Sequence, residues 1–408
     1  MIGDSFIFDY RLVKPDARPM KKFRVVFFAL VSTLLCCQKP YDPPATSTPN
    51  GYLVVEGVIN LSVDSTVIKV SRTVNLNNKT TINPVLGAAV TIEGEQGISV
   101  PLYDILNNGH YFSYNISISP SQRYRLRIID GAKQYVSDFV TVTQTPPIDS
   151  IGYNIQNDVL NMYVNAQDPT NNSKFYRWDY EETWLFHAKY VSGFVLDPSV
   201  NNIVPRPPYQ QVYYCYGNDV SPHIILNSTE KLSKNVLYQS PITQIPLTSE
   251  KVESKYSILV HQYAVTQDAF RFYQTLERNT EQLGSIFAVQ PSELTGNIHC
   301  TTDPNEPVLG YVTATNVKTK RIYILQKDLP YVQPIYPYDC HEDTALYRDK
   351  SGTNNVQNTL INPPIDYIPT SAVYSKGGIT VVIGYLYSSI QCTDCTIRGN
   401  KQAPPWWQ

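Results

Sequence analysis

The apolar and polar positions of this chain alternate in short runs separated by turn signals, which is the pattern of a mainly β protein. Between residues 51 and 145, Asn108-Gly109 and Asp130-Gly131 separate such runs, and these dipeptides are the strongest short signals for tight hairpins. Strands are expected over residues 52–59, 65–72, 88–92, 110–112, 124–129 and 135–140. This succession of short strands predicts an N-terminal immunoglobulin-like β-sandwich over residues 51–145.

A second β-rich domain is expected over residues 150–408. Pro146 and Pro147 precede it, and because proline cannot donate a hydrogen bond to a sheet, they mark the boundary. The clearest strand of this domain is 176–186, whose alternate positions carry Tyr176, Trp178, Tyr180, Trp184 and Phe186. We interpret this aromatic stripe as core rather than as a sugar-binding platform. Further strands are expected over residues 256–260, 310–315, 321–325 and 379–387.

Glu182 interrupts the aromatic stripe and has two interpretations. As a functional residue, it would be a buried acid in an aromatic wall or a ligand contact. As a structural residue, it would lie at a strand end, at a bulge that shifts its face, or beside an arginine. We favour the structural interpretation.

One segment of the second domain has helical periodicity. Thr266 can cap a helix through its hydroxyl group, and the following apolar positions recur at helical spacing. The apolar stripe consists of Ala269, Phe270, Tyr273 and Leu276. We expect one inserted helix over about residues 266–283, ending near Gly284.

The amino terminus has the features of a lipoprotein signal peptide. The basic run 21–24 precedes the apolar run 25–35, which is shorter than the roughly 20 residues that span a bilayer. The run ends at Cys36-Cys37, which looks like a lipobox. Cys37 is the expected lipidation site, because the alternative, Cys36, would follow Leu35 rather than a small residue.

Residues 1–36 are therefore expected to be an upstream extension and the signal peptide, with Met20 as the favoured start. Residues 37–50 are rich in proline and are expected to be a lipidated tether. An acyl anchor would place the protein in the cell envelope, in contact with a membrane.

Composition narrows the class of protein. A formal net charge of −2 gives no electrostatic case for binding nucleic acid. The chain has 31 tyrosines and 30 prolines but only 3 methionines, and 17% of its residues are charged. Tyrosine suits a pleated surface and proline suits turns, so this composition is typical of an extracytoplasmic β protein.

The cysteines are the remaining residues with distinctive chemistry. Four of them are disulfide candidates in an oxidising compartment: Cys215, Cys340, Cys392 and Cys395. Four cysteines allow three pairings, and we favour Cys215 and Cys340 each bonding one member of the Cys392/Cys395 pair, which leaves Cys300 free. The alternatives are a local bridge between Cys392 and Cys395, or a zinc site that adds Cys300 or Cys340 and the neighbouring His299 or His341.

The sequence contains none of the common catalytic motifs, neither a nucleophile elbow nor a phosphate-binding loop nor a metalloprotease helix. We therefore expect no catalytic residues, no metal and no cofactor. A glycosidase needs only a pair of carboxylates, and no fixed spacing in a sequence identifies such a pair. The lack of motifs is therefore weak evidence against an enzyme of this kind.

Several blocks carry a resemblance to a known family. They are Phe175–Trp184, Gly284–Phe287, Gly296–Ile298, Asn305–Tyr311, Cys392–Cys395 and Arg398–Lys401, together with Trp407. In combination these blocks resemble the Bacteroidota lipoprotein family called domain of unknown function 4249. The resemblance implies an envelope lipoprotein of a kind commonly encoded beside TonB-dependent outer-membrane receptors. It implies no catalytic or ligand-binding residues.

Two functional hypotheses follow. In the first, the protein is an outer-membrane lipoprotein that acts as a non-catalytic accessory or ligand-capture subunit of a TonB-dependent transporter. In the second, it is a free-standing structural or adhesive surface lipoprotein. The sequence identifies no small-molecule or glycan ligand, and it does not distinguish the periplasmic face from the cell surface.

Overall fold

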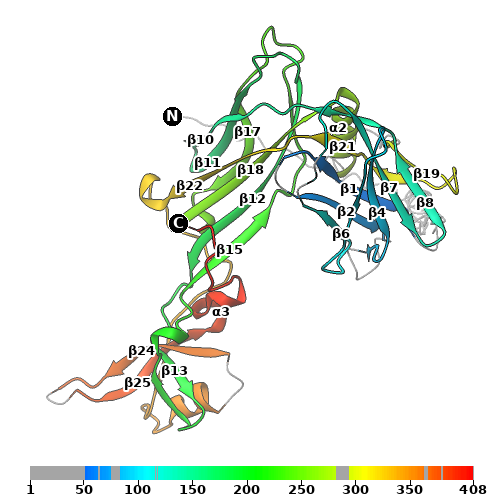
Figure 1. The fold of residues 1–408 in the computed structure, drawn as a ribbon. Helices are drawn as coiled ribbons and strands as arrows, with labels where there is room; N and C mark the ends of the chain where they lie inside the picture. The colour runs from blue at the N-terminus through cyan, green and yellow to red at the C-terminus, as the bar shows by residue number, and fades with distance from the viewer. Residues whose placement is uncertain are drawn as a thin grey trace, which may run out of the picture. The chain divides into compact units, whose positions relative to one another are not determined.

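The structure, a computed structural model, describes residues 51–62, 65–74, 83–114, 116, 118–281, 294–362, 366–377 and 380–407. Cys37, the signal peptide and the tether lie outside this range. The described chain is mainly β, as the sequence predicted, with one long helix (Figure 1). Among the described helices, none is both long and apolar enough to cross a membrane.

The first nine strands build the predicted sandwich. They are β1 (Leu53–Asn60), β2 (Thr66–Arg72), β3 (Asn83–Pro84), β4 (Ala89–Gly94), β5 (Ser99–Leu102), β6 (His110–Ser113), β7 (Arg123–Asp130), β8 (Lys133–Ser137) and β9 (Val140–Thr143). One layer pairs β1, β2, β3 and β6, and the other pairs β5, β4, β7 and β8. Alternate residues such as Val55, Ile68 and Leu126 are buried in a common core between the layers.

Three later strands complete this sandwich. They are β19 (Ile298–Cys300), β20 (Val308–Gly310) and β21 (Thr313–Thr315). β19 pairs with β8, whereas β20 and β21 run parallel to β1. A side chain at Gly310 would collide with the carbonyl oxygen of Val55, so glycine permits this close pairing. We expected residues 150–408 to form the second domain, but residues 298–315 pair with the first.

The second part of the chain is also a sandwich. Its three-stranded sheet contains β10 (Ile148–Gln156), β11 (Val159–Gln167) and β17 (Val236–Pro246). Its five-stranded sheet contains β15 (Tyr214–Val220), β12 (Phe175–His187), β18 (Lys255–Val265), β22 (Lys318–Leu325) and β16 (Ile225–Ser228). The aromatic stripe of β12 is buried in the core, as predicted.

The predicted helix is α2 (Gln267–Glu281). Thr266 caps it, since the Ala269 N–H donates to the Thr266 hydroxyl oxygen at 3.3 Å. Ala269 and Tyr273 are buried as expected, with Phe272 in addition, while Phe270 is only partly buried. The predicted end near Gly284 falls outside the described residues.

The sequence did not predict a small third cluster of strands. It contains β13 (Phe194–Asp197), β14 (Asn202–Pro205), β23 (Asp343–Leu346), β24 (Tyr367–Tyr374), β25 (Val382–Ser389) and the short helix α3 (Ile390–Thr393). Only β25 corresponds to an expected strand. Figure 1 shows β13 beside β24 and β25, and Ile203, Ala345 and Tyr385 form a shared core. We call this cluster the small module.

The disulfides in the structure form one of the two pairings that the favoured interpretation allowed. Cys215 is bonded to Cys395, and Cys340 is bonded to Cys392, with Cα–Cα separations of 5.6 and 5.7 Å. Cys300 is free and buried. The bridges attach the segment around α3 to β15 and to the loop that precedes β23.

Glu182 is buried and paired, but none of the three structural settings considered for it, a strand end, a bulge or a neighbouring arginine, is the one found. It lies in mid-strand, and its register to Ile258 and Asp219 is regular, so there is no bulge. Its side chain is only 2% exposed and forms an ion pair with Lys251 instead of an arginine. The Tyr256 hydroxyl also donates to it, at 2.5 Å.

Candidate functional site

A cavity of about 550 Å³ lies between the two sandwiches. We call it the cleft. Residues 54–57 of β1 form one wall, the outward side chains of β12 form another, and α2 contributes apolar residues. A cavity of about 440 Å³ shares Glu56, Lys69 and His261 with it. Both volumes lie within the range of roughly 300–1,000 Å³ that is usual for ligand pockets.

Strand alternation in β12 places its polar residues in the cleft. Because Tyr176, Trp178 and Tyr180 point into the core, Arg177 and Asp179 point the opposite way. The Ala264 N–H of β18 donates to the Thr145 hydroxyl oxygen at 2.9 Å, which joins β18 to the segment that follows β9.

Arg177 lies at the centre of the cleft. Its guanidinium carbon is 4.8 Å from the ring centroid of Tyr263 and 4.8 Å from that of Tyr273. Its Nη2 atom donates to Asp179 Oδ2 at 2.9 Å. Burial lowers the pKa of Arg177, but the tyrosines and Asp179 outweigh burial and raise the pKa overall. The residue is therefore a fixed cation held between two aromatic faces.

Asp179 joins the other polar groups of the cleft. Its Oδ1 atom lies 2.8 Å from His261 Nδ1 and accepts a hydrogen bond from the Tyr263 hydroxyl at 3.2 Å. Burial raises the pKa of Asp179, but the bond to His261 and the charge of Arg177 leave that pKa below its ordinary value. The carboxylate stays ionised and already has three partners, so it suits positioning better than proton transfer.

The α2 wall of the cleft is apolar. Phe272 and Tyr273 are buried, and Leu276 lies one turn further along the helix. Tyr311 packs against Phe272 at 5.3 Å between ring centroids. An apolar wall opposite a few fixed polar groups is the usual composition of a small-molecule binding site.

The charge network of the cleft yields a testable prediction. Asp179→Asn should lower the free energy of unfolding by about 1–3 kcal/mol at pH 7, because hydrogen bonds to an ionised partner are lost. The pKa of Asp179 is lower in the folded protein than in the unfolded chain, where it is about 3.9. The ionised carboxylate therefore stabilises the fold above that pH, and this contribution is lost as the pH falls toward the pKa of the folded state. The melting temperatures of the two proteins should therefore converge below about pH 4.

The control for this prediction is Asp339→Asn, which removes a carboxylate whose side chain is 88% exposed. Its melting temperature should follow that of the wild type at every pH. A constant gap between Asp179→Asn and the wild type from pH 7 down to pH 2 would contradict the assignment.

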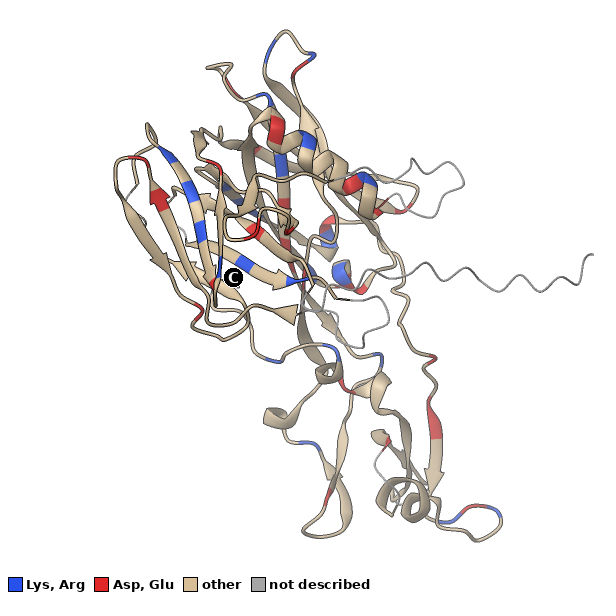
Figure 2. Cartoon of the chain, turned by 90° about the vertical axis from the view of Figure 1, so that its right-hand side faces the viewer, with Lys and Arg blue, Asp and Glu red and all other residues tan. Residues whose placement is uncertain are grey.

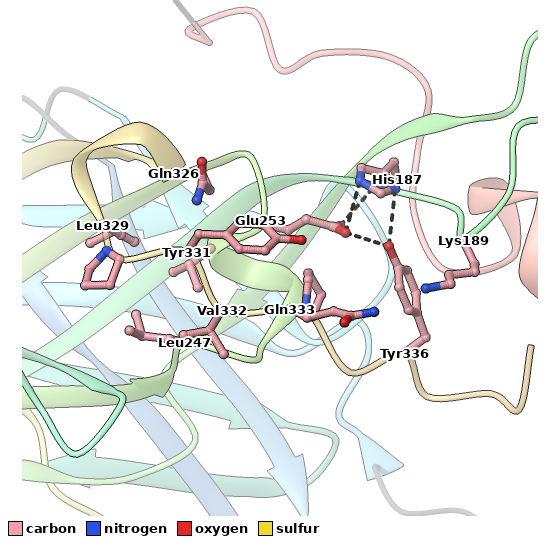
Figure 3. A pocket seen from close by; sticks show the side chains of 13 residues that line it. His187, Lys189, Leu247, Glu253, Gln326, Leu329, Tyr331, Val332, Gln333 and Tyr336 are labelled. Atoms are coloured by element: carbon pink, nitrogen blue, oxygen red, sulfur yellow. Dashed lines mark hydrogen bonds and ion pairs between the residues drawn. The ribbon is translucent and has the colours of Figure 1, made fainter.

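A smaller cavity of about 190 Å³ lies beside His187, Glu253 and Tyr336 (Figure 3). The Tyr336 hydroxyl donates to Glu253 Oε1 at 2.7 Å, and His187 Nε2 lies 3.1 Å from the same oxygen. Burial, followed by the contact with Glu253, raises the pKa of Tyr336. These three side chains are partners of one another, and their contacts attach the loop that carries Tyr336 to β12. We therefore assign them a structural role.

A row of arginines on β7 is not an uncompensated basic surface. Arg125 and Arg127 form ion pairs with Glu93 of β4, and Arg123 forms one with Glu95, the residue that follows this strand. Figure 2 shows basic and acidic residues interspersed on neighbouring strands.

None of the site residues predicted from the sequence lines the cleft. Cys215, Cys340, Cys392 and Cys395 form the bridges described above, and Cys37 lies outside the described residues. The cleft residues were missed, although one signal pointed to them. The outward positions of a strand with an aromatic inner face carry Arg177 and Asp179, and the paired strand β18 carries His261 and Tyr263.

Comparison with known proteins identifies the family. Residues 38–321 match the family described as domain of unknown function (DUF4249), and the chain belongs to this family. No curated protein matches the chain. The matched range contains the residues of the cleft and ends before Cys340, Cys392 and Cys395.

One solved structure is described as the complete structure of manganese lipoxygenase of Gaeumannomyces graminis and partial structure of zonadhesin of Komagataella pastoris. One of its chains aligns at 12% identity and a TM-score of 0.14, covering 54% of this chain and 91% of that chain. So low a score carries no argument about fold or function.

Proposed function

We propose that this protein is a Bacteroidota outer-membrane lipoprotein, anchored through Cys37, that captures a ligand in the cleft. In this proposal it acts as a non-catalytic accessory subunit of a TonB-dependent transporter. The observation that carries the proposal is the 550 Å³ cleft, with Arg177, Asp179 and His261 fixed opposite the apolar wall of α2.

Two further features support this proposal. The disulfides suit a protein folded in an oxidising compartment outside the cytoplasm. The apolar run before Cys37 suits a signal that is removed when the cysteine is acylated.

Binding accounts for the polar groups of the cleft better than catalysis does. Asp179 already accepts from Arg177, His261 and Tyr263, so it has little capacity left to take a proton from a substrate. Arg177 is held by two rings and a carboxylate, and moving it would disrupt all three contacts. Groups fixed before a ligand arrives reduce the entropy cost of binding.

The proposal predicts a stable complex in the membrane. A tagged protein, expressed in its own cells and extracted in mild detergent, should retain a large β-barrel protein in stoichiometric amount by mass spectrometry. Cys37→Ser is the control, because without the acyl chains the protein should lose both alkyne fatty-acid label and the barrel protein.

Two outcomes would count against the proposal. Fatty-acid labelling that persists in Cys37→Ser would exclude the anchor. Recovery of the lipoprotein alone, under conditions in which other barrel complexes survive, would favour a free-standing structural or adhesive protein.

A further inference from the structure

A further pocket lies where strands β12 and β15 of the five-stranded sheet meet the C-terminal tail. It measures about 330 Å³, and we call it the tail pocket. β12 and β15 contribute Thr183, Tyr216 and Asn218, while the tail contributes Asn400 and Gln402. None of these residues lines the cleft, so the tail pocket is separate from it.

The tail that forms one wall is firmly docked. Tyr216 and Asn400 exchange two backbone hydrogen bonds, of 2.7 and 2.9 Å. The ring of Trp407 lies edge-on to Tyr216 at 5.3 Å and to Tyr323 at 6.0 Å. The guanidinium carbon of Arg321 lies 3.5 Å from the centroid of Trp406. The pocket is therefore formed before any ligand binds.

The tail pocket has a mixed lining without a charged side chain, in which Gly217, Ala403, Pro404 and Pro405 accompany five polar residues. It offers the Thr183 hydroxyl, the Tyr216 phenol and the amides of Asn218, Asn400 and Gln402. The nearby cations have other partners, since Arg321 donates to Ser257 and Lys255 lies over the rings of Tyr323 and Trp407. An anionic ligand would lose its hydration here without gaining a cation, which is unfavourable.

Several of these polar groups have no partner among the described residues. Thr183 is only 6% exposed, yet its hydroxyl forms no hydrogen bond within the described chain, although it lines the pocket. The side-chain amides of Asn218 and Gln402 are likewise unpaired within that part of the chain. The hydroxyl oxygen of Thr183 is not among the described buried atoms that lack a partner, so it is accessible in the pocket and available to a ligand group or water.

We infer that the tail pocket binds an uncharged, polyhydroxylated ligand, namely a mono- or disaccharide. Amides offer both donors and acceptors to neighbouring sugar hydroxyls, and the Thr183 hydroxyl adds a further donor and acceptor. The Tyr216 ring supplies an apolar surface for sugar C–H groups. This inference does not depend on the cleft or on a transporter.

The test uses the full mature protein and a stated panel of sugars. Saturation-transfer NMR and calorimetry are carried out with glucose, galactose, N-acetylglucosamine, maltose and cellobiose, with glucuronate as the charged comparison. At least one neutral sugar should bind saturably and more tightly than glucuronate. Asn218→Ala combined with Gln402→Ala should weaken that binding on the order of tenfold, because two hydrogen-bonding groups are lost.

Two control variants separate the tail pocket from other sites. Gln156→Ala removes an exposed strand amide elsewhere and should leave sugar binding unchanged. Asn305→Ala removes an exposed turn amide and should also leave it unchanged. Thr183→Val keeps the shape of the buried side chain and should weaken binding without unfolding the sheet.

The inference fails if no neutral sugar of the panel binds at the highest concentration tested. It also fails if glucuronate binds better, or if the Asn218 and Gln402 substitutions leave the affinity unchanged. Since Asn218 and Gln402 are exposed, loss of folding would not account for an effect of replacing them. Failure here would leave the proposed transporter role untouched, because that role is tested by membrane co-purification.

Discussion

Replacing Cys215 and Cys395 together by alanine is expected to lower the free energy of unfolding by about 2–5 kcal/mol. The bridge joins residues separated by 180 positions, and closing so long a loop strongly restricts the unfolded chain. It also attaches the end of the small module to β15, and both cysteines are fully buried in the core of the second sandwich. Urea unfolding followed by tryptophan fluorescence measures the change.

Cys300→Ala is the matched control for this experiment. Cys300 is buried but unpaired, so its replacement removes a similar side chain without opening a loop. It should cost distinctly less than the loss of the bridge. Equal destabilisation by the two changes would show that the bridge contributes no more than ordinary packing. Non-reducing peptide mapping of the wild type should recover Cys215 joined to Cys395.

The elements that local pattern determines could be predicted from the sequence. Alternation located β12 and its buried face, because a period of two fixes which side chains share a side. Thr266 and the apolar positions that follow located the start of α2 to within one residue. The four bridged cysteines were also predicted, but setting aside a local bridge between Cys392 and Cys395 left two pairings, and the sequence did not distinguish them.

Features that depend on long-range pairing could not be predicted. β19, β20 and β21 have ordinary strand composition, and nothing local indicates that they pair with β8 and β1. The small module combines segments of about residues 194–205 and 343–393, which are far apart in the chain, and only its cystines hinted at the contact.

The cleft escaped prediction for the same reason. Arg177 and Asp179 are adjacent outward positions on one strand, but His261 and Tyr263 reach them only through pairing with β18. The third contributor, Tyr273, comes from α2. Each residue alone resembles an ordinary polar side chain at the protein surface, and only the assembled sheet and helix bring the residues together.

The last prediction concerns the buried ion pair inside the second sandwich. Lys251→Met should lower the free energy of unfolding by about 3–5 kcal/mol, because it leaves the Glu182 carboxylate buried without its cation. Methionine retains most of the apolar stem that packs near Trp184, so loss of charge is the principal change. Tyr256 still donates to Glu182, since burial and the nearby carboxylate raise its pKa and keep it protonated, but one phenol does not replace an ammonium group.

A double variant distinguishes the pair from simple packing. Glu182→Leu combined with Lys251→Met removes both charges together, and replacement of a buried ion pair by apolar residues is often close to neutral. The double variant should therefore be more stable than Lys251→Met alone, and a double-mutant cycle measured by urea unfolding gives the coupling energy. If the double variant is no more stable than the single one, the cost of Lys251→Met lies in its packing, and Glu182 does not depend on Lys251 for its burial.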